Sequence, residues 1–392
     1  MAKDSLLRDK NLLVIFGVTL MAVLGVSSIT PAFPTMAREL GITGGQIGLL
    51  ITSFTLPGAI LSPLMGIMAD RFGRKRILLP SLFLFAIAGT ACAFIQNFNL
   101  LLGLRVLQGI GAASLGSINA TIIGDLYSGR RRVEAMGLNA SALSIGVASY
   151  PAIGGALALL GWNYPFLLSI IALPIGILVL TVLKNPEPRN YQGIREYLSG
   201  TWSYLKNIKV AGLFAAGMLS FIILYGSYLT YFTLLMGESF GASSLIIGII
   251  MSIASLSNAV IASQLGRINR RLSLLAIINL GFSLYALAMV LIPFMPNLWL
   301  LLIPAIICGM ANGANMPSIQ TSVAELAPLE YRAAFMSLNT TMLRLGQTIG
   351  PPLLGLAYVY GGLDATFFAG AGLALLVPIV SIAFGRIKQA RS

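Results

Sequence analysis

Residues 136–155 of this 392-residue chain read MGLNASALSIGVASYPAIGG, and residues 336–355 read MSLNTTMLRLGQTIGPPLLG. The two stretches lie 200 residues apart and align without a gap. The same offset places further positions of the two halves on one another, namely Gly41 on Gly241, Gly48 on Gly248, Gly109 on Gly309 and Arg132 on Arg332. Internal repeats of this kind are typical of membrane proteins that are built from two similar bundles. The chain is therefore predicted to consist of two copies of one structural unit.

The composition indicates that the lipid bilayer is the solvent. Apolar residues make up 57% of the chain and charged residues only 9%, whereas soluble domains carry roughly 25% charged residues. Twelve apolar segments, from residues 11–33 to residues 366–384, have about the ~20 residues that a spanning helix needs. We expect an all-α membrane protein with 12 transmembrane helices in two parallel-related six-helix bundles. These bundles cover residues 1–184 and 210–392, and residues 185–209 form a cytoplasmic linker that is compatible with an amphipathic helix or a plain connection.

The charges indicate the orientation and exclude several function classes. The net charge is +13, but the basic residues lie in short loops, in every second loop along the chain. This pattern predicts a multi-pass protein of the inner cell membrane with both termini cytoplasmic, and it argues against a nucleic-acid partner. The chain has no histidine, and its two cysteines, Cys92 and Cys308, lie in apolar runs. We therefore expect no metal site, no disulfide and no enzymatic activity.

A loop after the second apolar segment carries the clearest motif. It reads Gly66-Ile-Met-Ala-Asp70-Arg71-Phe-Gly73-Arg74-Lys75-Arg76, and it resembles the signature G-x-x-x-D-R-x-G-R-[RK] of the major facilitator superfamily. The resemblance implies a conformational latch that holds the outward-facing state, formed by Gly66, Asp70, Arg71, Gly73, Arg74 and Asp125. From the residues alone, Gly66 allows close helix packing, Gly73 permits a tight turn, and Asp125 is placed to pair with Arg74. The alternative is a solvated loop whose charges only set the topology.

Two residues are candidates for proton coupling. The segment Arg105-Val-Leu-Gln108-Gly109-Ile-Gly111 resembles the R-x-x-Q-G-x-G segment of proton-coupled exporters in this family, in which the arginine is linked to proton movement. A buried arginine in a spanning helix is costly and therefore a functional candidate, with partial snorkelling to the outer surface as the alternative. Many multidrug antiporters of this family carry a deep carboxylate that takes the proton, but no acidic residue is expected near mid-membrane in this chain. Glu238, near the outer end of the seventh span, is the nearest substitute for such a carboxylate.

The fifth span resembles the antiporter motif G-x-x-x-G-P-x-x-G-G, with a tyrosine in place of the glycine before the proline. The eleventh span carries an echo of it. The resemblance implies a kinked, small-residue hinge and favours export over import. The hinge candidates are Gly146, Tyr150, Pro151, Gly154, Gly155, Gly350 and Pro351.

Arg344 is the main candidate for substrate binding. It lies about ten residues into the eleventh span, which is roughly 15 Å along a helix and close to the midplane where carriers bind substrate. A lone cation at this depth attracts an anionic or zwitterionic group, unless helix carbonyls or neighbouring amides satisfy it. By resemblance, spans 1, 4, 7 and 10 line the cavity. Their polar and aromatic candidates, which are equally compatible with helix packing, are Ser27, Asn119, Tyr225, Tyr228, Tyr231, Asn312 and Asn315.

These observations predict a secondary active transporter of the multidrug type. We expect it to export small amphipathic organic compounds in exchange for protons, by alternating access of one central site. The alternative is an exporter or facilitator of a specific metabolite, such as a sugar or an organic anion. The sequence has no G-x-x-x-x-G-K-[ST] phosphate-binding loop, so we expect the proton gradient to supply the energy and no cofactor to be needed. The expected partners are the substrate, protons and the bilayer, and the expected state is a monomer.

Overall fold

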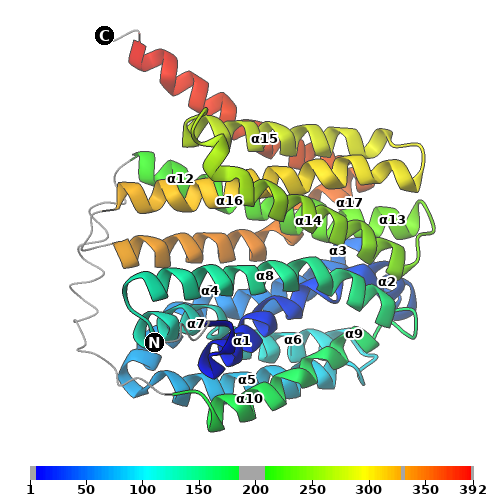
Figure 1. Ribbon diagram of the computed structural model, residues 1–392. Coiled ribbons are helices and arrows are strands. Elements are labelled where there is room, and N and C mark those ends of the chain that lie inside the picture. Colours follow the sequence, from blue (N-terminus) through cyan, green and yellow to red (C-terminus); the bar gives the residue numbers. More distant parts are fainter. Residues whose placement is uncertain (1–5, 185–207, 328–331, 390–392) are drawn as a thin grey trace. The chain divides into compact units, whose positions relative to one another are not determined.

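The computed structural model describes residues 6–184, 208–327 and 332–389 (Figure 1). All of the regular secondary structure assigned in these ranges is helical, which confirms the expected all-α membrane fold. Within these ranges, 11 helices are long and apolar enough to cross a bilayer. The amphipathic helix considered for the linker falls almost entirely on residues 185–207, outside the described part of the chain.

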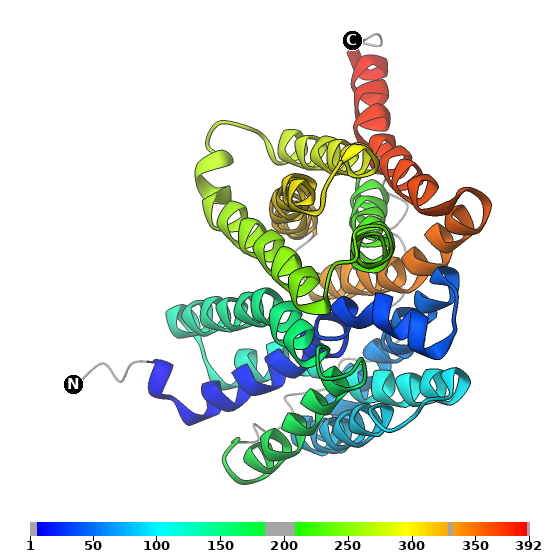
Figure 2. The same cartoon turned by 90° about the vertical axis from the view of Figure 1, so that its right-hand side faces the viewer.

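The last helix accounts for the difference between 11 and the expected 12 spans. Helix α17 (Arg332–Gln389) is 58 residues long and contains a break in its helical geometry. Gly361 has φ −144° and ψ 16°, and Gly362 has φ +70°, a left-handed conformation that favours glycine. Figure 2 shows the resulting sharp bend in the orange-to-red part of the ribbon. The helix therefore contains both of the last two predicted spans.

The chain forms two compact units, which we describe separately. Unit 1 comprises Met1–Gly41, Ser53–Tyr191 and Ser243–Gly248, as far as these residues are described. Its helix pairs α1 with α8 and α5 with α6 are in extensive contact. Its elements are η1 (Leu6–Arg8), α1 (Lys10–Ser27), η2 (Thr30–Ala32), α2 (Phe33–Leu40), most of α4 (Leu49–Phe72), α5 (Arg74–Cys92), α6 (Phe98–Ala112), α7 (Leu115–Leu126), α8 (Gly129–Leu157), α9 (Tyr164–Leu167), η3 (Leu168–Ile171) and α10 (Ala172–Thr181).

Unit 2 comprises Ile42–Thr52, Gln192–Ala242 and Ile249–Ser392, again as far as described. Its main helix contacts are those of α15 with α16, and of α17 with α12, α15 and η4. Its elements are α3 (Gly44–Ile47), α12 (Ile208–Ile222), the π-helix η4 (Ile223–Phe232), α13 (Thr233–Glu238), most of α14 (Ser244–Ile268), α15 (Leu274–Leu291), η5 (Ile292–Phe294), η6 (Leu298–Leu301), α16 (Leu302–Leu326) and α17. Each unit thus includes the first turns of a helix whose remainder lies in the other unit.

Local signals explain why corresponding elements begin at corresponding positions. Asn97 and Asn297, 200 residues apart, both act as N-caps, and each accepts a hydrogen bond from the backbone N–H three residues later, at 3.1 and 3.0 Å. Gly41 and Gly241 both adopt left-handed backbone, with φ +63° and +62°. The repeat in the sequence is therefore also a repeat in local conformation.

The same backbone contact occurs once in each unit. A methyl group at Gly109 of α6 would overlap the carbonyl oxygen of Phe54 on α4, and one at Gly309 of α16 would overlap the carbonyl oxygen of Ala254 on α14. The contacting residues are related by the 200-residue offset in both cases. Glycine is required at both positions because it lets two helix backbones touch, which is how small residues hold membrane helices together.

A second pair of contacts involves the first turns of α14 and the residues just before α4. In unit 1, added methyl groups at Gly155 and Gly248 would overlap the carbonyl oxygens of Ser244 and Pro151, respectively. The hydroxyl groups of Thr35 and Ser244 lie 3.5 Å apart in the same region. In unit 2, the position of a methyl group on Gly48 would be 2.9 Å from Cβ of Pro351. The Pro151–Gly248 and Pro351–Gly48 contacts are again related by the repeat.

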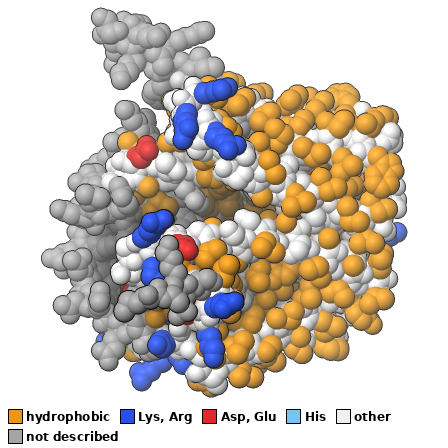
Figure 3. All heavy atoms as spheres, in the orientation of Figure 1, with side chains coloured by type: hydrophobic (Ala, Val, Ile, Leu, Met, Phe, Trp, Pro, Cys, Tyr) orange, Lys and Arg blue, Asp and Glu red, His pale blue; other side chains and the backbone are white. Residues whose placement is uncertain are grey.

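The surface is that of a protein in lipid. Figure 3 shows hydrophobic side chains over most of the visible face. Large side chains such as Phe94 and Tyr360 are 75% and 89% exposed. A soluble monomer rarely carries such continuous apolar surface, so the exposed face is suited to contact with acyl chains.

Candidate functional site

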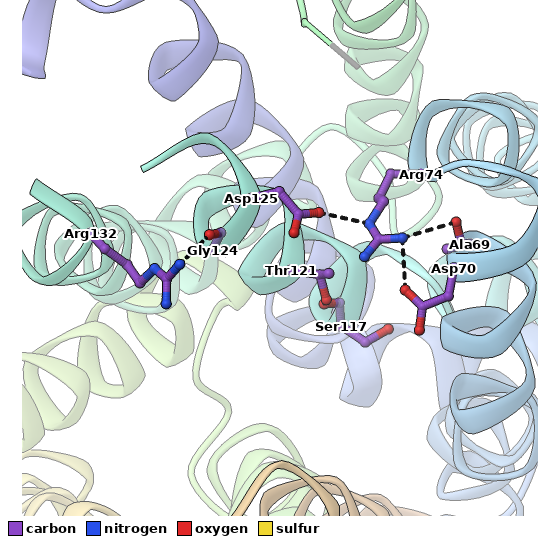
Figure 4. A network of polar contacts seen from close by, with 8 residues as sticks. All are labelled: Ala69, Asp70, Arg74, Ser117, Thr121, Gly124, Asp125 and Arg132. Atoms are coloured by element: carbon purple, nitrogen blue, oxygen red, sulfur yellow. Dashed lines mark hydrogen bonds and ion pairs between the residues drawn. The ribbon is translucent and has the colours of Figure 1, made fainter. Parts of the chain in front are cut away.

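Arg74, the first residue of α5, forms the centre of an ion-pair cluster in unit 1 (Figure 4). Its Nη1 lies 2.7 Å from Oδ1 of Asp70, and its Nε lies 2.9 Å from Oδ2 of Asp125. Nη1 also donates to the carbonyl oxygen of Ala69 at 3.3 Å. The Arg74 side chain is 8% exposed, so the two carboxylates neutralise a cation that would be costly to bury alone. The expected pairing of Arg74 with Asp125 is present, and its role as a latch stays a prediction.

The other signature residues have different surroundings. Gly73 has φ +100° immediately before α5, so the expected tight turn is present and requires glycine. Arg71 is exposed, and its guanidinium carbon lies 5.5 Å from the ring centroid of Phe72. The close helix packing expected at Gly66 is not found, because a methyl group there would meet no described atom within 4 Å. A match to the signature therefore does not show whether a given glycine packs against another helix.

The end of α7 makes further contacts that the sequence did not predict. Arg132 donates to the carbonyl oxygens of Gly124 and Tyr127 at 2.7 and 3.0 Å, which satisfies the last turn of that helix. The Tyr127 hydroxyl donates to Asp9 at 2.8 Å, and Asp9 caps the start of α1. Partial burial acts to raise the pKa of Asp9, but the hydrogen bonds from Tyr127 and Asn11 outweigh it and lower the pKa. In the sequence, the only indication of this capping role is that Asp9 comes just before an apolar run.

Arg105 is fully buried in unit 1, so the snorkelling alternative is wrong. Its Nη1 donates to the carbonyl oxygen of Gly25 at 2.8 Å and to the side-chain oxygen of Gln108 at 2.7 Å. Gln108 in turn donates to the Ser169 hydroxyl at 2.9 Å. The guanidinium carbon also lies 4.3 Å from the ring centroid of Phe54, a cation–π distance. This network links α6 with α1, α4 and η3.

The hinge candidates of α8 are closely packed against neighbouring helices. A methyl group at Gly154 would overlap the carbonyl oxygen of Ser28, and Gly146 faces Leu20 of α1. Tyr150 is buried and its ring lies beside Gly146, one turn earlier. In unit 2, a methyl group at Gly350 would be 2.8 Å from the Ile222 carbonyl oxygen. Tyr150 stands where the motif has a glycine, and Gly146, one turn earlier, leaves room for its ring.

The substrate candidates of unit 1 lie within the bundle. Asn119 donates to the Thr19 hydroxyl at 2.8 Å and to the Ile15 carbonyl oxygen at 3.2 Å. Thr19 donates to Asn139 at 2.7 Å, so α1, α7 and α8 share one polar network. Ser27 is partly buried at the last position of α1. These contacts show a helix-bridging role for Asn119, and its contact with substrate stays a prediction.

The three tyrosines of the seventh span do not share one face. They lie on the π-helix η4, where hydrogen bonds run from i to i+5. A π-helix has more residues per turn than an α-helix, so residues three apart fall further short of a full turn and do not line up along the axis. Tyr225 stacks on Phe221, Tyr228 on Phe232 and Tyr231 on Tyr358, with centroid distances of 5.5, 5.2 and 5.4 Å. The Tyr231 hydroxyl lies 3.4 Å from the Pro351 carbonyl oxygen. The three tyrosines that were expected to line one cavity are thus found in three different environments.

Tyr225 and Arg344 belong to one cluster in unit 2. The side-chain nitrogen of Gln347 donates to the Tyr225 hydroxyl at 3.1 Å. Arg344, one turn earlier on α17, is partly buried and close enough to Tyr225 to act on it electrostatically. Among the residues that the structure describes, no carboxylate lies within 4 Å of its guanidinium. We call Tyr225, Arg344 and Gln347 the cationic cluster.

The remaining candidates have other environments. Asn315 is fully buried on α16, and the Asn312 side-chain oxygen is also enclosed. Glu238 is exposed at the end of α13 and lies close enough to Tyr358 to act on it electrostatically. In the described part of the chain, no three His, Cys, Asp or Glu side chains are grouped as metal ligands would be.

Comparison with known sequences identifies the family. A family model described as Major Facilitator Superfamily matches residues 15–293 and 219–391. The chain is 26% identical to the "Bacillibactin exporter" of Bacillus subtilis (strain 168) over 366 residues, which cover 88% of this chain and 89% of that protein. It is 26% identical to "Multidrug resistance protein 2" of the same organism over 91% of both chains. It is 22% identical to "Quinolone resistance protein NorA" of Staphylococcus aureus over 94% of both.

Solved structures share the fold at low sequence identity. The nucleoside transporter NupG superposes with a TM-score of 0.79 at 16% identity, covering 96% of this chain and 98% of that one. A D-xylose-proton symporter gives a TM-score of 0.74 at 15% identity, covering 96% and 97%. The helical units, the signature loop with its ion pairs, and these matches together show that the chain belongs to the major facilitator superfamily of membrane transporters.

Proposed function

We propose that this transporter exports small amphipathic organic compounds, in particular anionic or zwitterionic ones, in exchange for protons. Three of its relatives are named as an exporter or as resistance proteins, and the glycine-rich segment of α8 resembles the antiporter motif. The proton gradient would supply the energy without a cofactor. The protein would act as a monomer in the inner membrane, with both termini cytoplasmic, because the basic loops alternate along the chain.

The cationic cluster is the observation that carries the substrate class. Arg344 offers a guanidinium that no described carboxylate neutralises, and an anionic group would form charge-assisted hydrogen bonds with it. Tyr225 and its stacked neighbour Phe221 add aromatic surface beside the charge. A substrate that is apolar at one end and anionic at the other would contact both the aromatic surface and the guanidinium.

The proton pathway is proposed from two residues with contrasting surroundings. Glu238 is exposed and can exchange protons with water at the end of α13. Arg105 is enclosed, and its bonds to the Gly25 carbonyl oxygen and Gln108 connect α6 with α1. We infer that Arg105 does not itself carry the proton, and that its hydrogen-bond network couples α6 to α1 during transport.

The second candidate function is export or facilitated release of a specific organic anion. Arg344 favours this function, because one cation at a fixed position in the site selects substrates that carry an anionic group at the matching position. The absence of acidic residues from mid-membrane positions of the sequence favours it as well, because multidrug antiporters of this family often use such a residue. The two functions differ in their dependence on the proton gradient.

The first test is the accumulation of an anionic aromatic dye in cells with and without this chain. We expect the chain to lower accumulation, and we expect a protonophore to abolish the difference because export is driven by the gradient. Dye export that continues unchanged after the gradient has collapsed would show a facilitator. A chain that changes the accumulation of no dye or antibiotic in an extended panel would contradict multidrug export.

The second prediction concerns Arg344. Arg344→Gln should reduce export of the anionic dye at least tenfold, which corresponds to ~1.4 kcal/mol, because the charge-assisted bonds are lost. Arg344→Lys keeps the charge but not the planar fork and should retain part of the rate. The matched control is Arg267→Gln, which removes an exposed cation that is bonded only to Gln264 in the structure. Equal rates for the wild type and both Arg344 variants would rule out the contact.

The third prediction concerns the latch. Arg74→Gln removes both ion pairs and leaves Asp70 and Asp125 facing each other, so transport should fall several-fold while the protein still reaches the membrane. Arg76→Gln, which removes an exposed cation in the same loop, is the control and should leave transport unchanged. Export rates normalised to the amount of membrane protein measure the effect. If Arg74→Gln and Arg76→Gln transport equally well, the charges of this loop serve only topology.

A further inference from the structure

Unit 2 contains a group of buried polar side chains that have no hydrogen-bond partner in the described structure. Tyr228 lies on η4, Tyr285 on α15 and Asn315 on α16. The two hydroxyl groups and both polar atoms of the amide are enclosed and unpartnered. Tyr285 and Asn315 are fully buried, and Tyr228 is 5% exposed. We call these three residues the neutral polar cluster.

Their neighbours place the three side chains in the same part of unit 2. A carbon atom added to Gly281 of α15 would overlap the Asn315 amide, and Tyr285 lies one turn further along the same face of α15. Cys308, two turns before Asn315 on α16, is close enough to both Tyr228 and Tyr285 to act on them electrostatically. Three helices therefore direct uncharged polar groups toward the same region inside unit 2.

The cluster continues along α16. The side-chain oxygen of Asn312 and the hydroxyl of Ser318, each about one turn from Asn315, are likewise enclosed and unpartnered. Leaving a buried donor or acceptor without a partner costs about 1–3 kcal/mol for each group. A low-dielectric bundle interior increases this cost. Such a concentration of unpartnered groups on adjoining helices is best explained by a ligand that can both donate and accept hydrogen bonds.

The chemistry of the cluster identifies that ligand. Tyrosine and serine hydroxyls donate and accept, and the asparagine amide donates from nitrogen and accepts at oxygen. None of these groups carries a charge, so the cluster offers nothing to neutralise a charged occupant. A site with several convergent neutral partners matches the two to four hydrogen bonds that buried water makes. We propose that the neutral polar cluster binds ordered water molecules that bridge η4, α15 and α16 inside unit 2.

This site is separate from the cationic cluster and does not depend on the proposed substrate. It gives Tyr228, Asn312 and Asn315, which the sequence suggested as substrate contacts, a different role. Water-mediated bonds are nearly as favourable as direct ones, and they exchange partners more easily.

Radiolytic labelling in ¹⁸O-enriched water tests the proposal on the full-length protein in detergent or nanodiscs. Radicals formed from bound water modify side chains that touch it, even when these side chains are buried. We expect Tyr228 and Tyr285 to take up ¹⁸O several-fold faster than Tyr231, which is equally buried but lies against the Pro351 carbonyl oxygen. Uptake no faster than that of Tyr231 would overturn the proposal.

Thermal unfolding of Tyr285→Phe gives a second readout whose sign is decisive. If the hydroxyl binds water, its removal costs a hydrogen bond and should lower Tm by about 2 °C. If the region is dry, the same change removes an unpaired buried hydroxyl and raises Tm. The substitution conserves the ring and is expected to fold, and Tyr231→Phe controls for the general effect of removing a tyrosine hydroxyl. A raised Tm for Tyr285→Phe would also overturn the proposal.

Discussion

Contact between a glycine and a backbone carbonyl is the interaction on which the rest of this structure depends. In a bilayer, apolar side chains gain little by leaving lipid for protein, so helices associate through close approach and internal hydrogen bonds. Gly109 against Phe54 and Gly309 against Ala254 provide that approach at the same place in each unit. Side chains that need precise neighbours, such as Arg105 beside Phe54, are positioned by these contacts. The duplication of the sequence is therefore a duplication of helix contacts.

Arg105 and Arg344, which both lie on apolar helices, show how the fold treats charge. Arg105 is bound by a carbonyl oxygen and an amide and lies over an aromatic ring, so its charge is used within the protein. Arg344 has aromatic and amide neighbours but no described carboxylate. Under the proposed function, this cation contacts the anionic group of the substrate. The difference between the two lies in their neighbours, since both occupy apolar helices of similar composition.

The sequence predicted those features that depend on short-range or repeated patterns. The apolar segments, the repeat and the pairing of Arg74 with Asp125 follow from spacing and charge, and the structure contains them. It could not predict contacts between distant segments, such as Tyr127 with Asp9 or Arg105 with Gly25. It also failed where local geometry departs from the α-helix. The π-helix η4 has no marker in its sequence. Tyr225, Tyr228 and Tyr231 were therefore expected to line one cavity, but they lie in three environments. At Gly66 the residue type indicated close packing, but no neighbour is there.

The contact between Thr35 and Ser244 offers the most direct test of the proposed alternating access, which predicts that this contact breaks during transport. Cysteines at both positions, where the hydroxyls are 3.5 Å apart, should form a disulfide on oxidation. The two native cysteines are buried, and each single-cysteine variant serves as a control. We predict that export by the oxidised double variant falls to background and returns on reduction. Export at full rate by the cross-linked protein would contradict the account.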